Sequence, residues 1–150
     1  MNDDNLQIAE LFLRLFAGTL FSFQGYDKLF RIKIPILTEA FALRVESYGL
    51  SRHLLNFFTY CSSSVELAAG LMLLTGFLTN FALYALGVNL LVVSFVFTFF
   101  EPMWNLRHVL PRLALVIFLL LVPIENKIFS LDQVLHQNES LLKKKTHENV

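Results

Sequence analysis

The sequence predicts an all-α membrane protein, a bundle of four transmembrane helices with an amphipathic interfacial segment between the first and second spans. Hydrophobic residues make up 55% of the 150-residue chain, more than in an average soluble domain, and sixteen residues are Phe. The apolar residues gather in long runs, which is the pattern of a polytopic membrane protein. The few charges inside those runs recur on one side of a helix, as expected for side chains that point into a bundle.

Composition also limits the classes of partner and chemistry. The 12 basic and 12 acidic residues balance, without a basic stripe, so we expect no nucleic-acid partner. The single cysteine, Cys61, excludes an intrachain disulfide framework and a CxxC redox pair. The acidic start of the chain is the opposite of a signal peptide's positive region, so the first span is expected to be its own insertion signal.

The first span is expected at about residues 6–30, long enough at about 1.5 Å per residue to cross about 30 Å of hydrocarbon. Two charges and two glycines fall within one narrow sector of this helix: Arg14, Gly18, Gly25 and Lys28. Glycines let a neighbouring helix approach closely, so we expect this face to look into the bundle. The next segment, 31–56, carries too much charge to span, and a short amphipathic helix after Pro35, lying on the membrane surface, is the better interpretation.

The second span, about 54–77, contains a carboxylate near its middle. An unpaired charge at that depth costs roughly 3 kcal/mol, so Glu66 needs a partner charge, a bound proton or a ligand. Gly70 shares its side of the helix, Ser51 is expected to cap the helix and Gly76 to end it. The turn after Gly76 is so short that the second and third spans must be antiparallel neighbours.

The third span is expected at about 81–100 and the fourth at about 108–123. The third span has its own small and polar sector, which contains Gly87, Ser94, Thr98 and Glu101. Asn89 falls on the opposite side, and Arg112 lies in the first turns of the fourth span. The membrane domain is therefore predicted to cover 1–135, followed by a polar tail at 136–150.

An even number of spans places both termini on the same side of the membrane. Loops one and three carry more Lys and Arg than the terminal side, so the positive-inside rule favours cytoplasmic loops and external termini. Lys28 and Arg112 add to this excess only if they lie at the surface rather than inside the bundle.

Three motifs, in their order and spacing, resemble those of the DoxX family of membrane proteins: residues 23–29 (FQGYDKL), 65–80 (VELAAGLMLLTGFLTN) and 130–132 (SLD). The resemblance implies a four-helix bundle in a prokaryotic cytoplasmic (inner) membrane. It also implies a redox context, since some members are membrane subunits of thiosulfate:quinone oxidoreductases or are linked to thiol and oxidative-stress systems. Two features depart from the family pattern: Asn80 replaces the usual basic residue, and 123–126 replaces a Gly-Pro-Gly turn.

The leading candidate site is a pair formed by Arg14 and Glu66, which both lie near bilayer depth on inward faces. Three interpretations are open: the pair fixes helix register, it holds a ligand or quinone headgroup, or it relays protons. We expect close helix packing at four glycines: Gly18, Gly25, Gly70 and Gly87.

A second group of charges would line a polar chamber at one end of the bundle. It consists of Lys28, Glu101 and Arg112, flanked by the hydroxyls of Ser94 and Thr98. Two cations beside hydroxyls suit a quinone or an anionic headgroup. The alternative for Lys28 and Arg112 is snorkelling to the membrane interface.

No catalytic or metal-binding residue is predicted. His53 and His108 stand at span ends, which argues against a bis-His haem, and no metal-ligand spacing recurs. Cys61 points away from the polar side of its span and is interpreted as a small apolar residue. Nothing resembles a nucleophile triad, a P-loop or a dinucleotide fingerprint.

The sequence therefore predicts an integral membrane subunit of a larger, redox-linked complex rather than an enzyme by itself. Its expected partners are membrane lipid and other membrane subunits, which the Phe clusters would contact, and quinone is the candidate cofactor. The alternative is a non-catalytic accessory or assembly protein whose buried ion pairs are purely structural. A small transporter is less favoured, because four spans without an internal repeat rarely form an alternating-access pathway.

Overall fold

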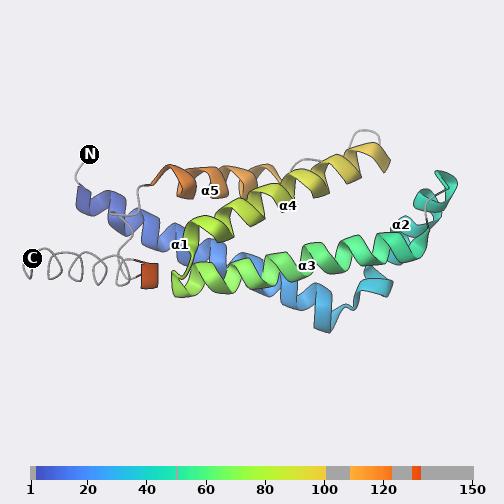
Figure 1. Ribbon diagram of the computed structural model, residues 1–150, viewed down its shortest axis with the longest axis horizontal. Coiled ribbons are helices and arrows are strands. Elements are labelled where there is room, and N and C mark those ends of the chain that lie inside the picture. The colour runs from blue at the N-terminus through green and yellow to red at the C-terminus, as the bar shows by residue number, and fades with distance from the viewer. Residues whose placement is uncertain (1–2, 50, 101–108, 123–129, 133–150) are drawn as a thin grey trace, which may run out of the picture.

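The computed structural model of the chain describes residues 3–49, 51–100, 109–122 and 130–132. Most of these residues are helical, and no strand occurs among them. The helices are α1 (Asp3–Tyr26), the short π-helix η1 (Asp27–Arg31), α2 (Ile34–Ser47), α3 (Arg52–Thr75), α4 (Thr79–Phe100) and α5 (Leu110–Leu121) (Figure 1). The predicted all-α fold is confirmed.

Among the described residues, three helical segments are long and apolar enough to cross a membrane: Asn5–Arg31, Arg52–Thr75 and Thr79–Val96. The apolar α5 has 12 residues, about 18 Å of helix, which is shorter than the hydrocarbon core of a bilayer. The part of the chain that the structure describes is therefore a membrane bundle of three full-length spans and one shorter apolar helix.

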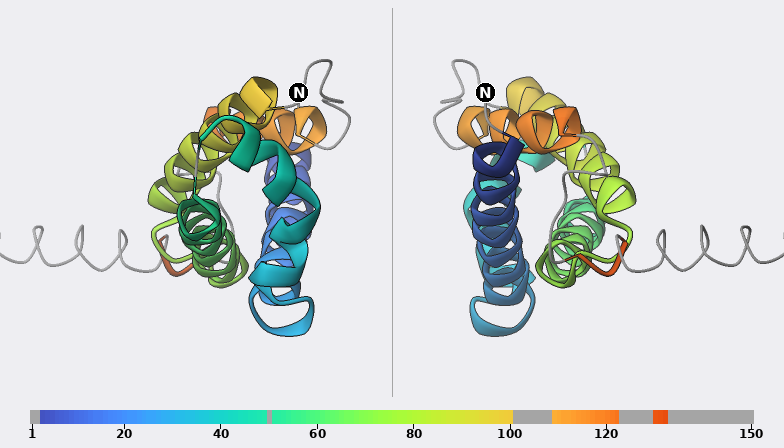
Figure 2. Two further views of the ribbon diagram at one scale, coloured as in Figure 1. Left: turned by 90° about the vertical axis from the view of Figure 1, so that its right-hand side faces the viewer. Right: turned by 90° about the vertical axis from the view of Figure 1, so that its left-hand side faces the viewer.

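The helices α1, α3, α4 and α5 form a ring in which each contacts the next. α1 lies along α3, and α3 leads through a tight turn into α4. Figure 1 shows α3 and α4 diverging from this turn, with α5 beside α4. α5 also contacts α1, so it links the last span back to the first. Figure 2 shows α2 crossing the end of the bundle where α3 begins.

The core of the bundle is apolar, and so are its outer faces. The core side chains come from α1, α3, α4 and α5 and include Ala17, Phe21, Leu73, Leu83, Leu86, Val116 and Leu119. The large side chains that point outward are also hydrophobic, among them Phe12, Phe16 and Phe23 on α1 and Phe81, Val88 and Phe95 on α4. A soluble protein would not expose so much aromatic surface, and a bilayer accommodates it without cost.

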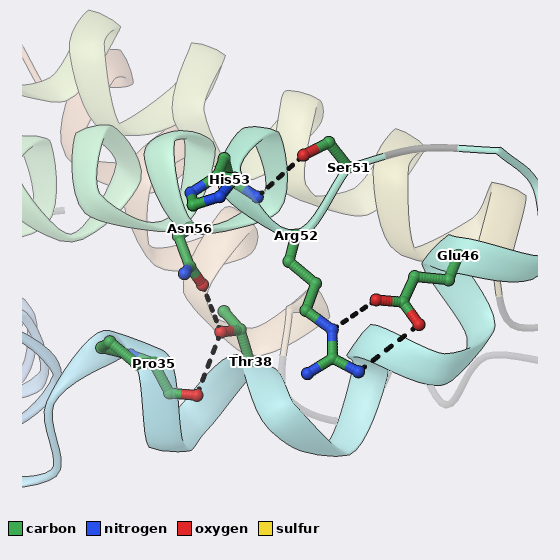
Figure 3. Close-up of polar contacts among 7 residues, drawn as sticks. All are labelled: Pro35, Thr38, Glu46, Ser51, Arg52, His53 and Asn56. Atoms are coloured by element: carbon green, nitrogen blue, oxygen red, sulfur yellow. Dashed lines mark hydrogen bonds and ion pairs between the residues drawn. The ribbon is translucent and has the colours of Figure 1, made fainter.

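α2 covers the first turns of α3, and the two helices share polar contacts (Figure 3). Ile34 and Thr38 are buried, whereas Ile36 is 62% exposed, so α2 has one inward and one outward side as predicted. The Thr38 hydroxyl forms a hydrogen bond with Oδ1 of Asn56 on α3. Whether α2 also lies on the membrane surface stays a prediction.

A second contact joins the end of α2 to the start of α3. The Arg52 guanidinium donates hydrogen bonds to the Glu46 carboxylate (Figure 3). This hydrogen bond stabilises the ionised carboxylate and so holds the pKa of Glu46 below its usual value. Both side chains are exposed, so the contact orients the two helices more than it stabilises them.

The ends of α3 follow the sequence signals. Ser51 caps the first turn, because its Oγ accepts a hydrogen bond from the His53 amide at 3.2 Å. At the other end Gly76 adopts a left-handed conformation, with φ of 66°. The amide of Phe77 bonds to the Met72 carbonyl and that of Gly76 to the Leu73 carbonyl, which is the Schellman pattern that ends a helix.

Residues 130–132, which we call the clasp, dock onto the turn between α3 and α4. The Asp132 carboxylate accepts hydrogen bonds from the amides of Leu78 and Thr79, both at 2.7 Å, and so caps the start of α4. The Asp132 amide donates to the Gly76 carbonyl at 3.0 Å. Leu78 has φ of 47°, a left-handed conformation that is unfavourable for a non-glycine residue, and the hydrogen bond to Asp132 helps to hold it. The clasp thus ties a distant segment to the α3–α4 turn.

Candidate functional site

Glycines on both helices allow α1 and α3 to approach each other closely. A Cβ atom at Gly25 would lie 2.5 Å from the Leu67 amide nitrogen, and one at Gly70 would lie 2.5 Å from the Ser22 amide nitrogen. A Cβ at Gly18 would lie 3.0 Å from the Gly70 carbonyl oxygen. The two backbones are therefore in direct contact, and these three glycines fix the register of α1 against α3.

Gly87 does not share this role. It lies on α4 toward α5, where a Cβ would be 3.8 Å from Cγ1 of Val116, an ordinary van der Waals contact. The space around Gly87 would accept an alanine, so the expectation of a close helix approach at this position is not met.

Glu66 is paired with Lys28 across the α1–α3 contact. Lys28 Nζ lies 2.5 Å from Glu66 Oε2. The Glu66 side chain is 3% exposed and the Lys28 side chain is 27% exposed, so the cation reaches inward to a buried carboxylate. Lys28 stands in η1, and π-helical turns of this kind are frequent at functional sites.

Arg14 is not the partner of Glu66, which corrects the pair expected from the sequence. Arg14 Nε instead lies 3.1 Å from Oε1 of Glu10, one turn earlier on α1, and both side chains are almost completely buried. The glycine register is the reason: it sets Arg14 beside Leu73, seven residues or about 10 Å along α3 from Glu66. Glu10 was missed by the sequence reasoning, although its i, i+4 spacing from Arg14 is a recognisable signal.

The Arg14 side chain binds a backbone carbonyl in the last turn of α3. Its Nη1 donates to the Leu73 carbonyl at 3.4 Å, and a Cβ at Gly76 would overlap this nitrogen. A cation at this position faces the negative end of the helix dipole and gives the Leu73 carbonyl a second donor beside the Gly76 amide. Residue 76 is therefore glycine for two reasons: its backbone is left-handed, and a side chain there would collide with the guanidinium.

The hydroxyls expected to flank a polar chamber are bonded within their own helix. Ser94 Oγ donates to the Leu90 carbonyl at 2.7 Å, and Thr98 Oγ1 donates to the Ser94 carbonyl at 2.8 Å. Arg112 is partly buried in the first turn of α5 and forms no ion pair with another residue that the structure describes. Glu101 lies outside the described residues. Among the described chamber candidates, Lys28 pairs with Glu66 of the neighbouring helix, whereas Thr98 bonds to the backbone of Ser94 in its own helix.

No metal site is found in the described part of the chain, where no group of three His, Cys, Asp or Glu side chains comes together. His53 is exposed at the start of α3, and His108 lies outside the described residues. Cys61 is exposed on the outer side of α3, away from the buried polar residues.

The helices and the buried charges define a multi-pass membrane protein of the helical-bundle class. A model of the DoxX family matches residues 9–99, more than half of the chain, and the protein therefore belongs to the DoxX family. No curated protein and no solved structure matches it. The match ends before α5, so the likeness of residues 130–132 to the family's closing motif rests on the sequence alone.

Proposed function

We propose that this protein is a membrane subunit of a larger, redox-linked assembly, in which it anchors partner subunits and holds a quinone-like ligand beside Lys28 and Glu66. The observation that carries the proposal is this ion pair, which joins a buried carboxylate to a partly exposed ammonium between two spans. The redox context comes from the family resemblance, and the two side chains supply chemistry that fits it.

The chemistry of the pair suits a quinone and its reduced form. A lysine ammonium has three donors, and only one is bonded to Glu66. A second donor is therefore available to a quinone carbonyl oxygen, and the carboxylate can accept the hydroxyl of the reduced quinol. Because the site lies between apolar helices, hydrogen bonds to these charges are stronger there than in water.

The outer faces support the anchoring role. Large apolar side chains cover the outward sides of both α1 and α4, and they suit either lipid or apolar helices of other subunits. The exposed Arg31, Lys33 and Arg52 gather at the end of the bundle formed by η1, α2 and the start of α3. This end, which we call the loop-one end, is proposed to face the cytoplasm of a prokaryotic cell.

The test is quinone binding by the protein extracted under mild conditions and held in lipid nanodiscs. We expect bound quinone, and a Lys28→Met variant should bind it roughly 10-fold to 100-fold more weakly, the range for one charge-assisted hydrogen bond. Lys33→Met is the matched control, since Lys33 is an exposed lysine at the same end. Absence of quinone binding by the intact protein, or equal binding by the Lys28→Met variant, would contradict the ligand proposal.

The rival function is an accessory or assembly protein whose ion pairs are purely structural. It is favoured by the Glu10–Arg14 pair, which is almost completely buried and held at the end of α3. The double variant Lys28→Met, Glu66→Leu separates the two. If it is stable and retains partners but loses quinone, the pair is a ligand site; if it recovers every property lost in the single variants, the pair is structural.

A further inference from the structure

A polar stripe runs along the inner face of α3 and stops at Glu66. Its members follow at intervals of three or four residues and so share one side of the helix: Asn56, Thr59, Ser63 and Glu66. Beyond Glu66 the same side continues with Gly70 and Leu73. The stripe therefore covers only the half of α3 that leads from the loop-one end to the ion pair.

Burial increases along the stripe from the loop-one end inward. Asn56 and Thr59 are half-buried, Ser63 is 0% exposed and Glu66 is 2% exposed. The neighbours opposite the stripe are polar as well: Thr38 of α2 bonds to Asn56 (Figure 3), and Lys28 of η1 bonds to Glu66. Polar groups thus meet across this boundary at its outer end and at its buried end, and between them the Thr59 hydroxyl donates to the Leu55 carbonyl of its own helix.

Two buried polar atoms on the loop-one side of this contact have no hydrogen-bond partner among the residues that the structure describes: Gln24 Oε1 and Ser63 Oγ. The contact of Gly25 with Ser63 places both of them within about two helical turns of Glu66. Each such group costs roughly 1–3 kcal/mol when it is unsatisfied, and lipid cannot satisfy it. A small molecule that both donates and accepts hydrogen bonds would satisfy both of them.

The close packing of α1 on α3 begins at Gly25, opposite Ser63 and Leu67, and past Glu66 the side chains around it are mostly apolar. Phe21 and Leu73 are completely buried, and the Gly70 backbone meets the Ser22 backbone so closely that no side chain fits between them. The next buried charges, Glu10 and Arg14, lie beyond this apolar layer at the far end of α3. A polar path from the loop-one end is therefore closed behind the ion pair.

We propose that water enters the bundle from the loop-one end along this stripe, reaches the Lys28–Glu66 pair and goes no further. The pair is then a hydrated site, open to small hydrophilic molecules from one side of the membrane only. This inference goes beyond the proposed function, because it requires neither a quinone nor a partner subunit.

The experiment uses the fact that the chain has one cysteine, Cys61. In a Cys61→Ser background, single cysteines are introduced at Thr59 and Ser63 on the stripe, and at Ala69, a buried small residue of α3 beyond Glu66, as the matched control. Sealed right-side-out and inside-out membrane vesicles are treated with a small, membrane-impermeant trimethylammonium methanethiosulfonate. Labelling after denaturation in detergent shows that each thiol is intact and reactive.

We expect the Thr59→Cys and Ser63→Cys variants to react at least about tenfold faster than the Ala69→Cys variant, because a thiol needs water to ionise and react. Both should react from the same face of the membrane only, which identifies the side of the loop-one end. Reaction of both stripe positions at the rate of the Ala69→Cys variant would overturn the proposal. Equal labelling from the two faces, or a reactive Ala69→Cys variant, would also overturn it, since the path would then not end at Glu66. Because Thr59 is only half-buried, the Thr59→Cys variant keeps the test available if Ser63→Cys disturbs folding.

Discussion

Replacing Asp132 by alanine should destabilise the protein by removing the cap of α4. The carboxylate accepts two backbone hydrogen bonds, from Leu78 and Thr79, each at 2.7 Å. Loss of an N-cap side chain costs about 0.5–2 kcal/mol. Loss of a negative charge at a helix N-terminus costs about 0.3–1 kcal/mol more. Because Leu78 must also keep its left-handed conformation without this support, we expect a total of about 2–3 kcal/mol.

The assay is reversible unfolding in mixed micelles, followed by circular dichroism of the wild-type chain and its variants. Asp132→Asn should lose about half as much as Asp132→Ala, since the amide keeps one acceptor oxygen. Asp27→Ala is the matched control: its carboxylate pairs at 3.6 Å with Arg31, which is 78% exposed, so its loss should cost below about 0.5 kcal/mol. An Asp132→Ala variant as stable as Asp27→Ala would refute the role assigned to the clasp.

Three further predictions use the same unfolding assay. Gly70→Val should lower the free energy of unfolding by more than about 2 kcal/mol, because its Cβ would meet the Ser22 backbone. Gly87→Ala should stay within about 0.5 kcal/mol of wild type, and equal effects of the two variants would contradict the packing argument. Arg14→Leu should lower the free energy of unfolding by about 3–5 kcal/mol, because the Glu10 charge stays buried without Arg14. The double variant with Glu10→Leu should recover most of this stability, and no recovery would show that the two charges act separately. Because the contact with Arg52 lowers the pKa of Glu46, it contributes stability above the ordinary carboxyl pKa of about 4.3 and loses it as pH falls through the lower folded value. Glu46→Gln should therefore flatten the dependence of the melting temperature on pH between about pH 5 and 3. An unchanged pH profile would contradict this assignment.

Most of the helical architecture was readable from local signals. Ser51 and Gly76 bound α3 because a capping hydroxyl and a left-handed glycine act within a few residues of their own position. The inward face of α1 followed from the spacing of Gly18 and Gly25, which a helix of fixed period must place on one side. These are properties of a single helix, and the sequence determines them directly.

The pairing of the buried charges was not readable in the same way. The sequence placed Arg14 and Glu66 on inward faces, but their separation depends on how far α1 slides along α3, and backbone contacts at three glycines set that register. Lys28 reaches Glu66 from a π-helical turn, for which the sequence carries no recognised signature. The Asp132 motif was noticed through its resemblance to a family pattern, yet its target is more than fifty residues away in the chain.

The clasp also sets an order for biogenesis. The amides of Leu78 and Thr79 belong to the turn between the second and third full-length spans, whereas their acceptor, Asp132, follows α5. A growing chain is made from its N-terminus, so α3 and α4 are synthesised while this turn still lacks its cap. Completion of the hairpin therefore waits for residues 130–132, made after α5, and a chain truncated after α4 would lack this cap permanently.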